Sequence, residues 1–189
     1  GSVRNGEDSH FAYGSEQVYS GHFVEHLEPF VAAIAHRTAA MMPYYSKPVG
    51  LELGGEPVEE VGFGYNRQIV TGLLRGRLGY AGIVLSDWEL VNDNLVGDQV
   101  LPARAWGVEG LTPPERLLKL LDAGVDQFGG EECVDLLLDL VASGRVGEAR
   151  LDASARRILE VKFELGLFDD PFVDVAAAAA VVASAGFLA

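Results

Sequence analysis

Residues 73–88, LLRGRLGYAGIVLSDW, decide the fold. Their first part continues the helical spacing of a predicted helix over about 66–78. A glycine-rich turn follows, and then the short apolar run Ile83–Leu85, which has the composition of a buried strand. The strand ends at the polar pair Ser86 and Asp87. A helix that leads into a short buried strand with a polar end is typical of parallel α/β sheets.

The same pattern occurs twice more. A predicted helix over about 23–36 precedes the apolar run 39–42. A third predicted helix opens with TPPE at 112–115, the pattern in which the Thr and Glu side chains each satisfy the other residue's free backbone donor. It leads into Ala123–Asp126, the third predicted strand. The sequence therefore predicts an α/β fold with three parallel strands.

The rest of the chain holds further helices and irregular ends. Helices are predicted over about 131–143 and 152–165, and residues 1–21 are predicted to form an irregular loop. A complete eight-stranded α/β barrel needs roughly 250 residues. With 189 residues and three strands, the chain is either a small open sheet or part of a barrel.

Composition narrows the classes of partner. The chain has 14 basic and 28 acidic residues, a net charge of −14, which disfavours binding to nucleic acid or to anionic membranes. No stretch reaches the ~20 apolar residues needed to span a bilayer. The single cysteine, Cys133, excludes an intrachain disulfide and a Cys-based metal cluster. With no signal peptide visible either, the cytoplasm is slightly favoured, but the compartment stays open.

A metal site on histidines is the remaining possibility for an inorganic group. His22 and His26 have the i, i+4 spacing that could clamp a metal on a helix. No carboxylate pattern of a recognised type accompanies them. We therefore predict no metal and no cofactor.

The predicted strand ends are where the chemistry of a parallel α/β protein is expected. Pro43–Tyr45, Ser86–Trp88 and Asp126–Phe128 each combine a polar group with an aromatic ring. Aromatic faces stack on sugars, and a carboxylate can attack an anomeric carbon. Each segment also has a structural interpretation, because a Ser-Asp pair caps turns and aromatic rings pack loops onto cores.

The context of Asp87 resembles a known signature. Paired leucines, a basic residue, the Gly-aromatic-x-Gly step, the apolar strand and Ser-Asp-Trp are similar to the signature of glycoside hydrolase family 3, which includes β-glucosidases and β-xylosidases. The resemblance implies that Asp87 is the catalytic nucleophile of a retaining glycosidase, with Trp88 in contact with substrate. Leu90 departs from the pattern, where a small or polar residue is usual.

Further segments extend the resemblance over most of residues 5–175. Met42–Tyr45 resembles the segment that supplies a tyrosine beside the nucleophile, which implies Tyr45, and Tyr44 is a second candidate for substrate binding. Residues 123–126 resemble the last barrel strand, and 156–168 the helix that ends the family's first domain. The implied fold is a partial (β/α)8 TIM-type barrel over 22–172, roughly the last three βα units with terminal helices. An Ala-rich tail or linker follows over 173–189.

Some parts of the family pattern are missing. The first strands, with a substrate-binding Asp, an Arg and a Lys-His pair, have no counterpart here, and the acid/base usually comes from a second domain. Glu89, Asp93 and Asp98 are weak candidates for that second carboxyl role. We therefore expect a segment that is inactive alone and that needs either the missing part of the same enzyme or self-association.

Two further classes of function stay open besides the inactive segment. A competent hydrolase could form by oligomerisation or with a partner chain, and a β-linked sugar or glycoside would be its substrate. The alternative is a non-catalytic carbohydrate-binding or structural α/β module.

Overall fold

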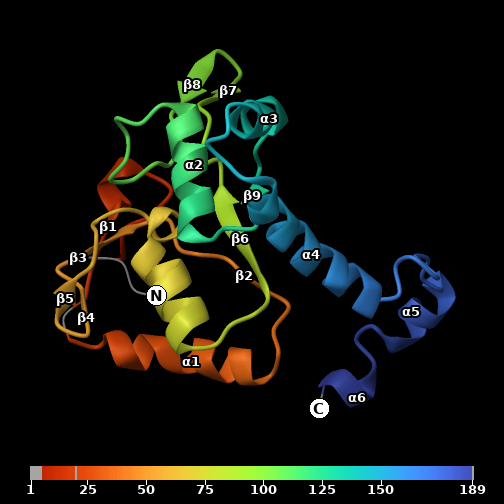
Figure 1. Ribbon diagram of the computed structural model, residues 1–189. Coiled ribbons are helices and arrows are strands. Elements are labelled where there is room, and N and C mark those ends of the chain that lie inside the picture. Colours follow the sequence, from red (N-terminus) through yellow and green to blue (C-terminus); the bar gives the residue numbers. More distant parts are fainter. Residues whose placement is uncertain (1–5, 20, 189) are drawn as a thin grey trace.

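The computed structural model describes residues 6–19 and 21–188, which form a mixed α/β fold (Figure 1). Its centre is a three-stranded parallel sheet of β2 (Ala40–Met41), β6 (Ile83–Trp88) and β9 (Gln127–Gly129), with β6 in the middle. The described residues form no closed barrel. The predicted α/β class with three parallel strands is confirmed.

Smaller sheets surround the central one. β1 (Glu16–Val18) pairs in parallel with β3 (Lys47–Val49), so the described part of the N-terminal segment contains a strand as well as loop. Two antiparallel hairpins complete the set: β4 (Glu52–Leu53) with β5 (Glu56–Pro57), and β7 (Asn94–Val96) with β8 (Gln99–Leu101). The predicted boundaries of the domain and its flanking segments are not tested by these pairings.

Helices lie close to the predicted ranges. The helix expected over 66–78 is a π-helix, in which the Leu78 amide donates to the Leu73 carbonyl. Three-residue 3₁₀ turns occur at η2 (Ala12–Gly14) and η3 (Phe63–Tyr65). The π-helix just described is η4 (Gln68–Arg77). The other helices are α1 (Phe23–Ala35), α2 (Pro113–Ala123), α3 (Val134–Ala142), α4 (Glu148–Glu164), α5 (Val175–Val181) and α6 (Ala185–Leu188).

The predicted strand 123–126 is wrong in its position. The Glu115 carboxylate accepts hydrogen bonds from the Thr112 amide and hydroxyl, as the capping pattern predicts, but α2 runs on to Ala123. Gly124 then takes a left-handed φ of +109°, which ends the helix. A side chain there would meet the Thr71 hydroxyl at 2.9 Å. The strand therefore begins only at Gln127.

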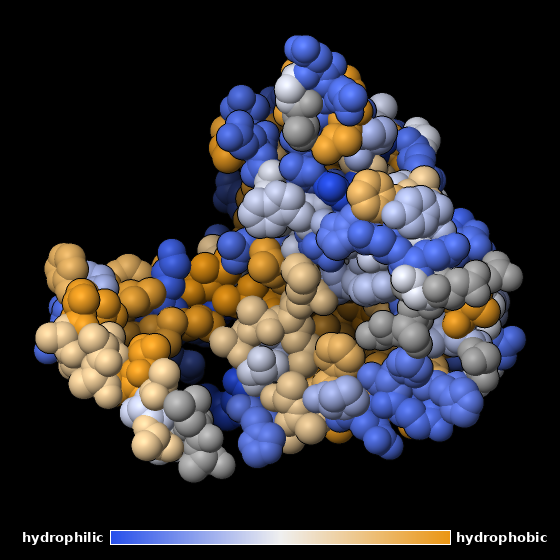
Figure 2. Space-filling model, turned by 180° about the vertical axis from the view of Figure 1, so that it is seen from behind, coloured by the Kyte–Doolittle hydropathy of each residue, from blue (hydrophilic) through white to orange (hydrophobic). Residues whose placement is uncertain are grey.

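A helical arm projects from the body of the molecule. α4 leads away from the sheet, and α5 and α6 lie at its far end (Figure 1). Figure 2 shows that much of this arm is hydrophobic on its surface. Phe163, Leu165 and Phe172 are among its exposed apolar residues. None of the helices in the described part of the chain is both long enough and apolar enough to cross a bilayer.

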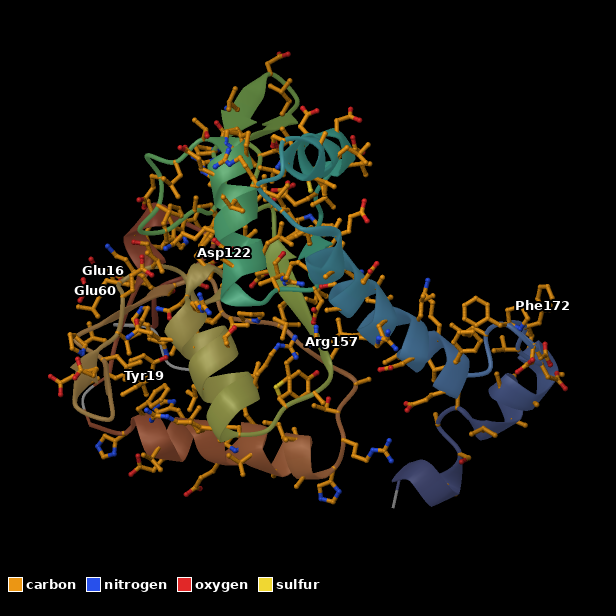
Figure 3. The ribbon with its side chains drawn as sticks, viewed as in Figure 1. Glu16, Tyr19, Glu60, Asp122, Arg157 and Phe172 are labelled. Carbon is orange, nitrogen blue, oxygen red and sulfur yellow. The ribbon has the colours of Figure 1, made fainter. Side chains whose placement is uncertain are left out.

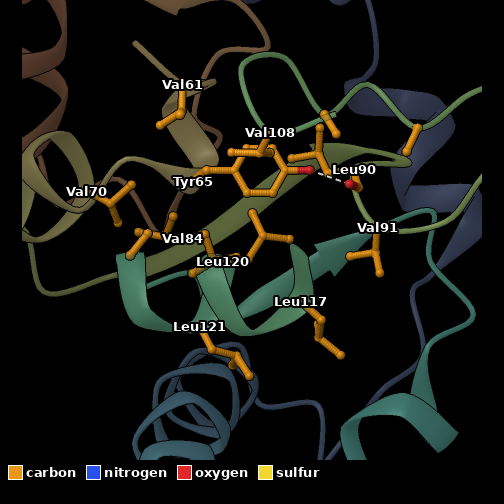
Figure 4. Close-up of a cluster of buried hydrophobic side chains, with 14 of the residues drawn as sticks. Val61, Tyr65, Val70, Val84, Leu90, Val91, Val108, Leu117, Leu120 and Leu121 are labelled. Carbon is orange, nitrogen blue, oxygen red and sulfur yellow. Dashed lines mark hydrogen bonds between the residues drawn. The ribbon is translucent and has the colours of Figure 1, made fainter. Parts of the chain in front are cut away.

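The main hydrophobic core lies between the sheet and the helices that cover it (Figure 4). Leu117 and Leu120 of α2 are fully buried, as is Val84 of β6. Tyr65 is buried among them, and its hydroxyl donates to the Leu90 carbonyl. Burial of these side chains supplies most of the stabilisation that fixes β6 beneath α2.

A buried carboxylate ties the start of β6 to two helices, η4 and α4. The Asp126 side chain has no exposed surface, and its Oδ2 accepts from the Arg75 guanidinium at 2.6 Å and from the Val84 amide at 3.0 Å. Its Oδ1 accepts from the Ser154 hydroxyl and from Arg157, both at 2.8 Å. Figure 3 shows Arg157 reaching from α4 toward this region.

The Asp126 network predicts a large effect on stability. We expect Asp126→Asn to lower the free energy of unfolding by about 3–5 kcal/mol, because the buried arginines lose their counter-charge. Urea unfolding followed by circular dichroism measures the change. The exposed Asp152, on the same helix as Arg157, is the control, since Asp152→Asn should stay within about 0.5 kcal/mol. Equal losses in the two variants would contradict the assignment.

Candidate active site

Asp87 and Trp88 lie at the C-terminal end of β6, and Tyr45 reaches them from the chain that follows β2. The Tyr45 hydroxyl donates to the Trp88 carbonyl at 2.8 Å and accepts from the Trp88 amide at 3.0 Å. Tyr45 itself is buried. One phenol therefore fixes both polar groups of the residue next to Asp87.

The Asp87 carboxylate is partly buried and contacts this same peptide group. Its Oδ1 accepts from the Trp88 amide at 2.8 Å. Burial, and then the nearby Asp87 carboxylate, raise the pKa of the Tyr45 phenol, so it stays protonated at neutral pH. The arrangement gives a carboxylate that is oriented and still accessible, as a nucleophile requires.

The indole of Trp88 extends from the sheet with 60% of its surface exposed. It lies against Gly130, which has a φ of +66°. A Cβ atom at Gly130 would come within 2.4 Å of the indole ring. Only glycine therefore allows the ring this position, where its open face can stack on a sugar.

Hydrogen bonds between β6 and β9 hold the backbone around Asp87. The buried Ser86 hydroxyl accepts from the Gly129 amide and donates to the Asp87 carbonyl, both at 2.8 Å. The pairing of the two strands shifts register between Leu85 and Trp88. The irregularity lets the chain turn outward at the strand end, which re-aims the side chains there.

The loop beyond β6 is fastened by two acidic side chains. The Glu131 carboxylate accepts from the Val91 amide at 2.5 Å and from the Asn92 side chain at 3.0 Å. Glu89 pairs with Arg104 at 2.6 Å. The Glu89 carboxylate is therefore engaged as the acceptor in a contact with Arg104.

Tyr44 lies apart from the other three candidates. Its ring meets Phe63 edge-to-face at 6.3 Å, and it lines an apolar hollow of about 190 Å³ between α1 and η4. None of its described contacts involves Asp87, Tyr45 or Trp88. The structure thus brings together three of the four residues that the sequence nominated. A larger hollow, about 690 Å³, lies near the start of β6 and is lined in part by Arg157.

The described residues contain no group of three or more His, Cys, Asp or Glu side chains that could hold a metal ion. His22 is bonded to Glu25 at 3.3 Å, and His26 packs edge-to-face on Tyr19. Cys133 is buried just before α3, where burial raises the pKa of its thiol to about 11. The thiol is therefore protonated at neutral pH.

Comparison with known proteins identifies the family. The Glycosyl hydrolase family 3 N terminal domain matches residues 3–161. The chain belongs to glycosyl hydrolase family 3. It is 54% identical over 189 residues to a probable β-glucosidase C of Aspergillus flavus, covering all of this chain and 29% of the relative.

A second relative and a solved structure are also similar to this chain. A periplasmic β-glucosidase/β-xylosidase of Dickeya chrysanthemi is 42% identical, over 98% of this chain and 30% of the relative. The fold is similar to that of a solved β-glucosidase involved in saponin metabolism from intestinal bacteria, with a TM-score of 0.68 and 24% identity over 92% of this chain and 21% of that one. The chain spans about 30% of the length of the curated relatives it matches.

Several residues that shape this candidate site were missed from the sequence. Gly129 and Gly130 directly follow the third nominated segment, and paired glycines after a strand indicate a close backbone approach. Arg104 carries no comparable signal, because it lies in a loop without periodicity. Its role follows only from the contacts of the folded chain.

The contact between Gly130 and the indole predicts a local effect of substitution. We expect Gly130→Ala to displace the Trp88 ring, because the new methyl group occupies its position. Acrylamide quenching of fluorescence measures the change, since Trp106 is buried and Trp88 dominates the accessible emission.

Gly144→Ala is the matched control. Gly144 has a similar φ of +71° but has no atom within 4 Å of an added Cβ. Both variants carry the backbone strain of about 1 kcal/mol, but only Gly130→Ala should alter quenching. Identical quenching in the two variants would show that the indole does not rest on Gly130.

Proposed function

We propose that this chain carries the nucleophile of a retaining β-glycosidase, acting on terminal β-glucosides or β-xylosides. Asp87 attacks the anomeric carbon and the glycosidic C–O bond breaks, which gives a covalent glycosyl-enzyme. Water then cleaves that intermediate with a second inversion, so the product keeps the β configuration. The observation that carries the proposal is the open Asp87 carboxylate, oriented at the C-terminal end of β6 beside Tyr45 and Trp88.

The aromatic groups have distinct roles in the proposal. Trp88, with its exposed indole, packs on the C–H face of the sugar. Tyr45 stays protonated and holds the Trp88 peptide group. Tyr44 reaches substrate in this proposal only through a rearrangement of the hollow that it lines.

A second carboxyl must protonate the leaving oxygen from ~5–5.5 Å away. Glu89 is engaged by Arg104, and the Asp93 carboxylate accepts from the Ala103 amide at 2.8 Å. Asp98 lies in the turn between β7 and β8. Glu89 and Asp93 are thus engaged in other contacts, and Asp98 lies in a hairpin turn. We infer that the acid/base comes from another part of the enzyme.

The fold is proposed to be the last three βα units of a (β/α)8 barrel with terminal helices. β2 and β9 are the two edges of the central sheet, and barrel closure removes such edges. The apolar side chains of α1 and of the arm would then pack on the remaining βα units. The preferred partner of these surfaces is therefore the rest of the same enzyme.

A chimaera tests the function. This chain replaces the matching segment of the Dickeya chrysanthemi enzyme, which supplies the remaining strands and second domain. We expect release of nitrophenol from an aryl β-glucoside or β-xyloside, and a loss of about 10³-fold or more in Asp87→Asn. Mass spectrometry after treatment with a 2-deoxy-2-fluoro-β-glycoside should find the sugar on Asp87.

Asp98→Asn is the control, because this exposed carboxylate lies in the β7–β8 turn. Its turnover should stay within about twofold of the parent chimaera. A folded chimaera that binds glucose but never turns over substrate, with binding unchanged by Asp87→Ala, would replace the hydrolase proposal with a non-catalytic carbohydrate-binding module.

The open edges and apolar faces predict that the chain alone self-associates. We expect size exclusion with light scattering to give a mass well above the 20.2 kDa of one chain. Phe30 is exposed on α1 and lines the apolar hollow, so Phe30→Glu should reduce the association.

Ala32→Glu places the same charge on an exposed position of the same helix, two residues away and on a different face. Its mass distribution should match that of the unsubstituted chain. A monomeric chain with a cooperative melt would contradict the prediction.

A further inference from the structure

Glu89, the residue after Trp88, has a strained backbone. Its φ of +59° is a left-handed conformation that residues with side chains rarely adopt. Two backbone hydrogen bonds hold it: the Glu89 amide donates to the Gly129 carbonyl, and the Glu89 carbonyl accepts from the Arg104 amide, both at 3.0 Å. The chain therefore turns sharply just beyond the proposed nucleophile, and two other segments fix the turn.

The side chain of Glu89 is held as firmly as its backbone. Its carboxylate accepts from the Arg104 guanidinium at 2.6 Å, and the two side chains are only 20% and 18% exposed. The Nε of Arg104 is buried and finds no hydrogen-bond partner among the described residues. A buried donor without an acceptor lowers stability, so stability alone does not account for this arginine.

Arg104 also contacts the residue that orients the site. Its guanidinium carbon lies 5.8 Å from the centre of the Tyr45 ring, within the range of a cation–π interaction. The His10 ring meets the Tyr45 ring edge-to-face at 4.9 Å. The orientation of the phenol thus depends on side chains from two loops.

The Tyr45 hydroxyl connects the orientation of the Tyr45 ring to the position of Asp87 through the Trp88 peptide group. It is bonded to both the carbonyl and the amide of Trp88, and the same amide donates to Asp87 Oδ1. A shift of the Tyr45 ring would therefore move the peptide group on which the carboxylate rests. Glu89, Arg104 and Tyr45 form a closed circuit of contacts around that peptide group.

We propose that the Glu89–Arg104 ion pair positions the Asp87 carboxylate, by holding the Tyr45 ring so that its hydroxyl fixes the Trp88 peptide group. Glu89 and Arg104 are positioning residues, which need not touch substrate. The inference rests on the proposed function, in which Asp87 attacks the anomeric carbon. A misplacement of about 1 Å at a reacting group can reduce the rate about 10²-fold.

Kinetics of the chimaera test the proposal. We expect Arg104→Met and Glu89→Gln each to lower kcat at least about tenfold, with KM changed less than about threefold, because alignment and not substrate binding is lost. Arg104→Lys keeps the positive charge and should recover part of the kcat lost in Arg104→Met.

Glu59→Gln is the matched control, since Glu59 pairs with Lys119 at 2.7 Å in another part of the molecule. Its kcat should stay within about twofold of the parent. A fall in kcat equal to that of Glu89→Gln would mean that loss of any ion pair has this effect, and would overturn the proposal.

Amide exchange in the chain itself gives a readout that needs no turnover. Exchange of the Trp88 amide, followed by NMR, should be about tenfold faster in Arg104→Met and unchanged in Glu59→Gln. Glu89→Gln, a milder change, should show the same direction if Arg104→Met fails to fold. Unaltered Trp88 exchange in a folded Glu89→Gln chain would refute the positioning role.

The two proposals fail in different ways. An inactive parent chimaera would contradict the function while the exchange experiment still decided the role of the ion pair. An active parent whose kcat is indifferent to Glu89 and Arg104 would leave the function standing and remove the inference.

Discussion

A buried carboxylate is the constraint on which the rest of the molecule depends. Asp126 is enclosed where η4, α4 and the start of β6 meet, and it accepts from two arginines, a serine hydroxyl and a backbone amide. Burial lowers the pKa of the Arg75 and Arg150 guanidinium groups, and Asp126 counters that shift. A charge so deeply enclosed tolerates only the arrangement that surrounds it with donors, which fixes the helices relative to the sheet.

The two ends of β6 have different roles in the structure. Its start is bound through Val84 to Asp126 in a buried structural contact. Its end is shaped by Tyr45 and by the paired glycines after β9, which leave Asp87 accessible and the Trp88 indole open. Structural contacts at one end of the strand and the proposed nucleophile at the other is the distribution expected of parallel α/β enzymes.

Much of this architecture could be predicted from the sequence. Leu117 and Leu121 have helical spacing after a capping pair, and the strand 83–85 is bounded by a glycine and a polar pair, so local signals agree with the fold. The strand predicted at 123–126 was misplaced because the sequence Ala-Gly-Val-Asp is compatible with both a strand and the end of a helix. Gly124 resolves the choice, since it adopts a left-handed conformation without strain and so ends α2 ahead of the strand. Arg104 was beyond prediction, as its partners lie 15 and 59 residues away in the chain.

The α4 helix is anchored in the core near its middle and held by an exposed contact at its C-terminal end. Ser154 is the one buried residue of α4 in the described chain. The Asp126 carboxylate accepts hydrogen bonds from Ser154 and from Arg157 of this helix. The ten residues after Ser154, up to Glu164, extend about 15 Å from this anchor, and Glu164 pairs there with Arg37 at 3.7 Å. An exposed ion pair of this kind contributes little stability, so the buried contacts of Asp126 set the direction in which the C-terminal half of α4, with its exposed Phe163, leaves the core.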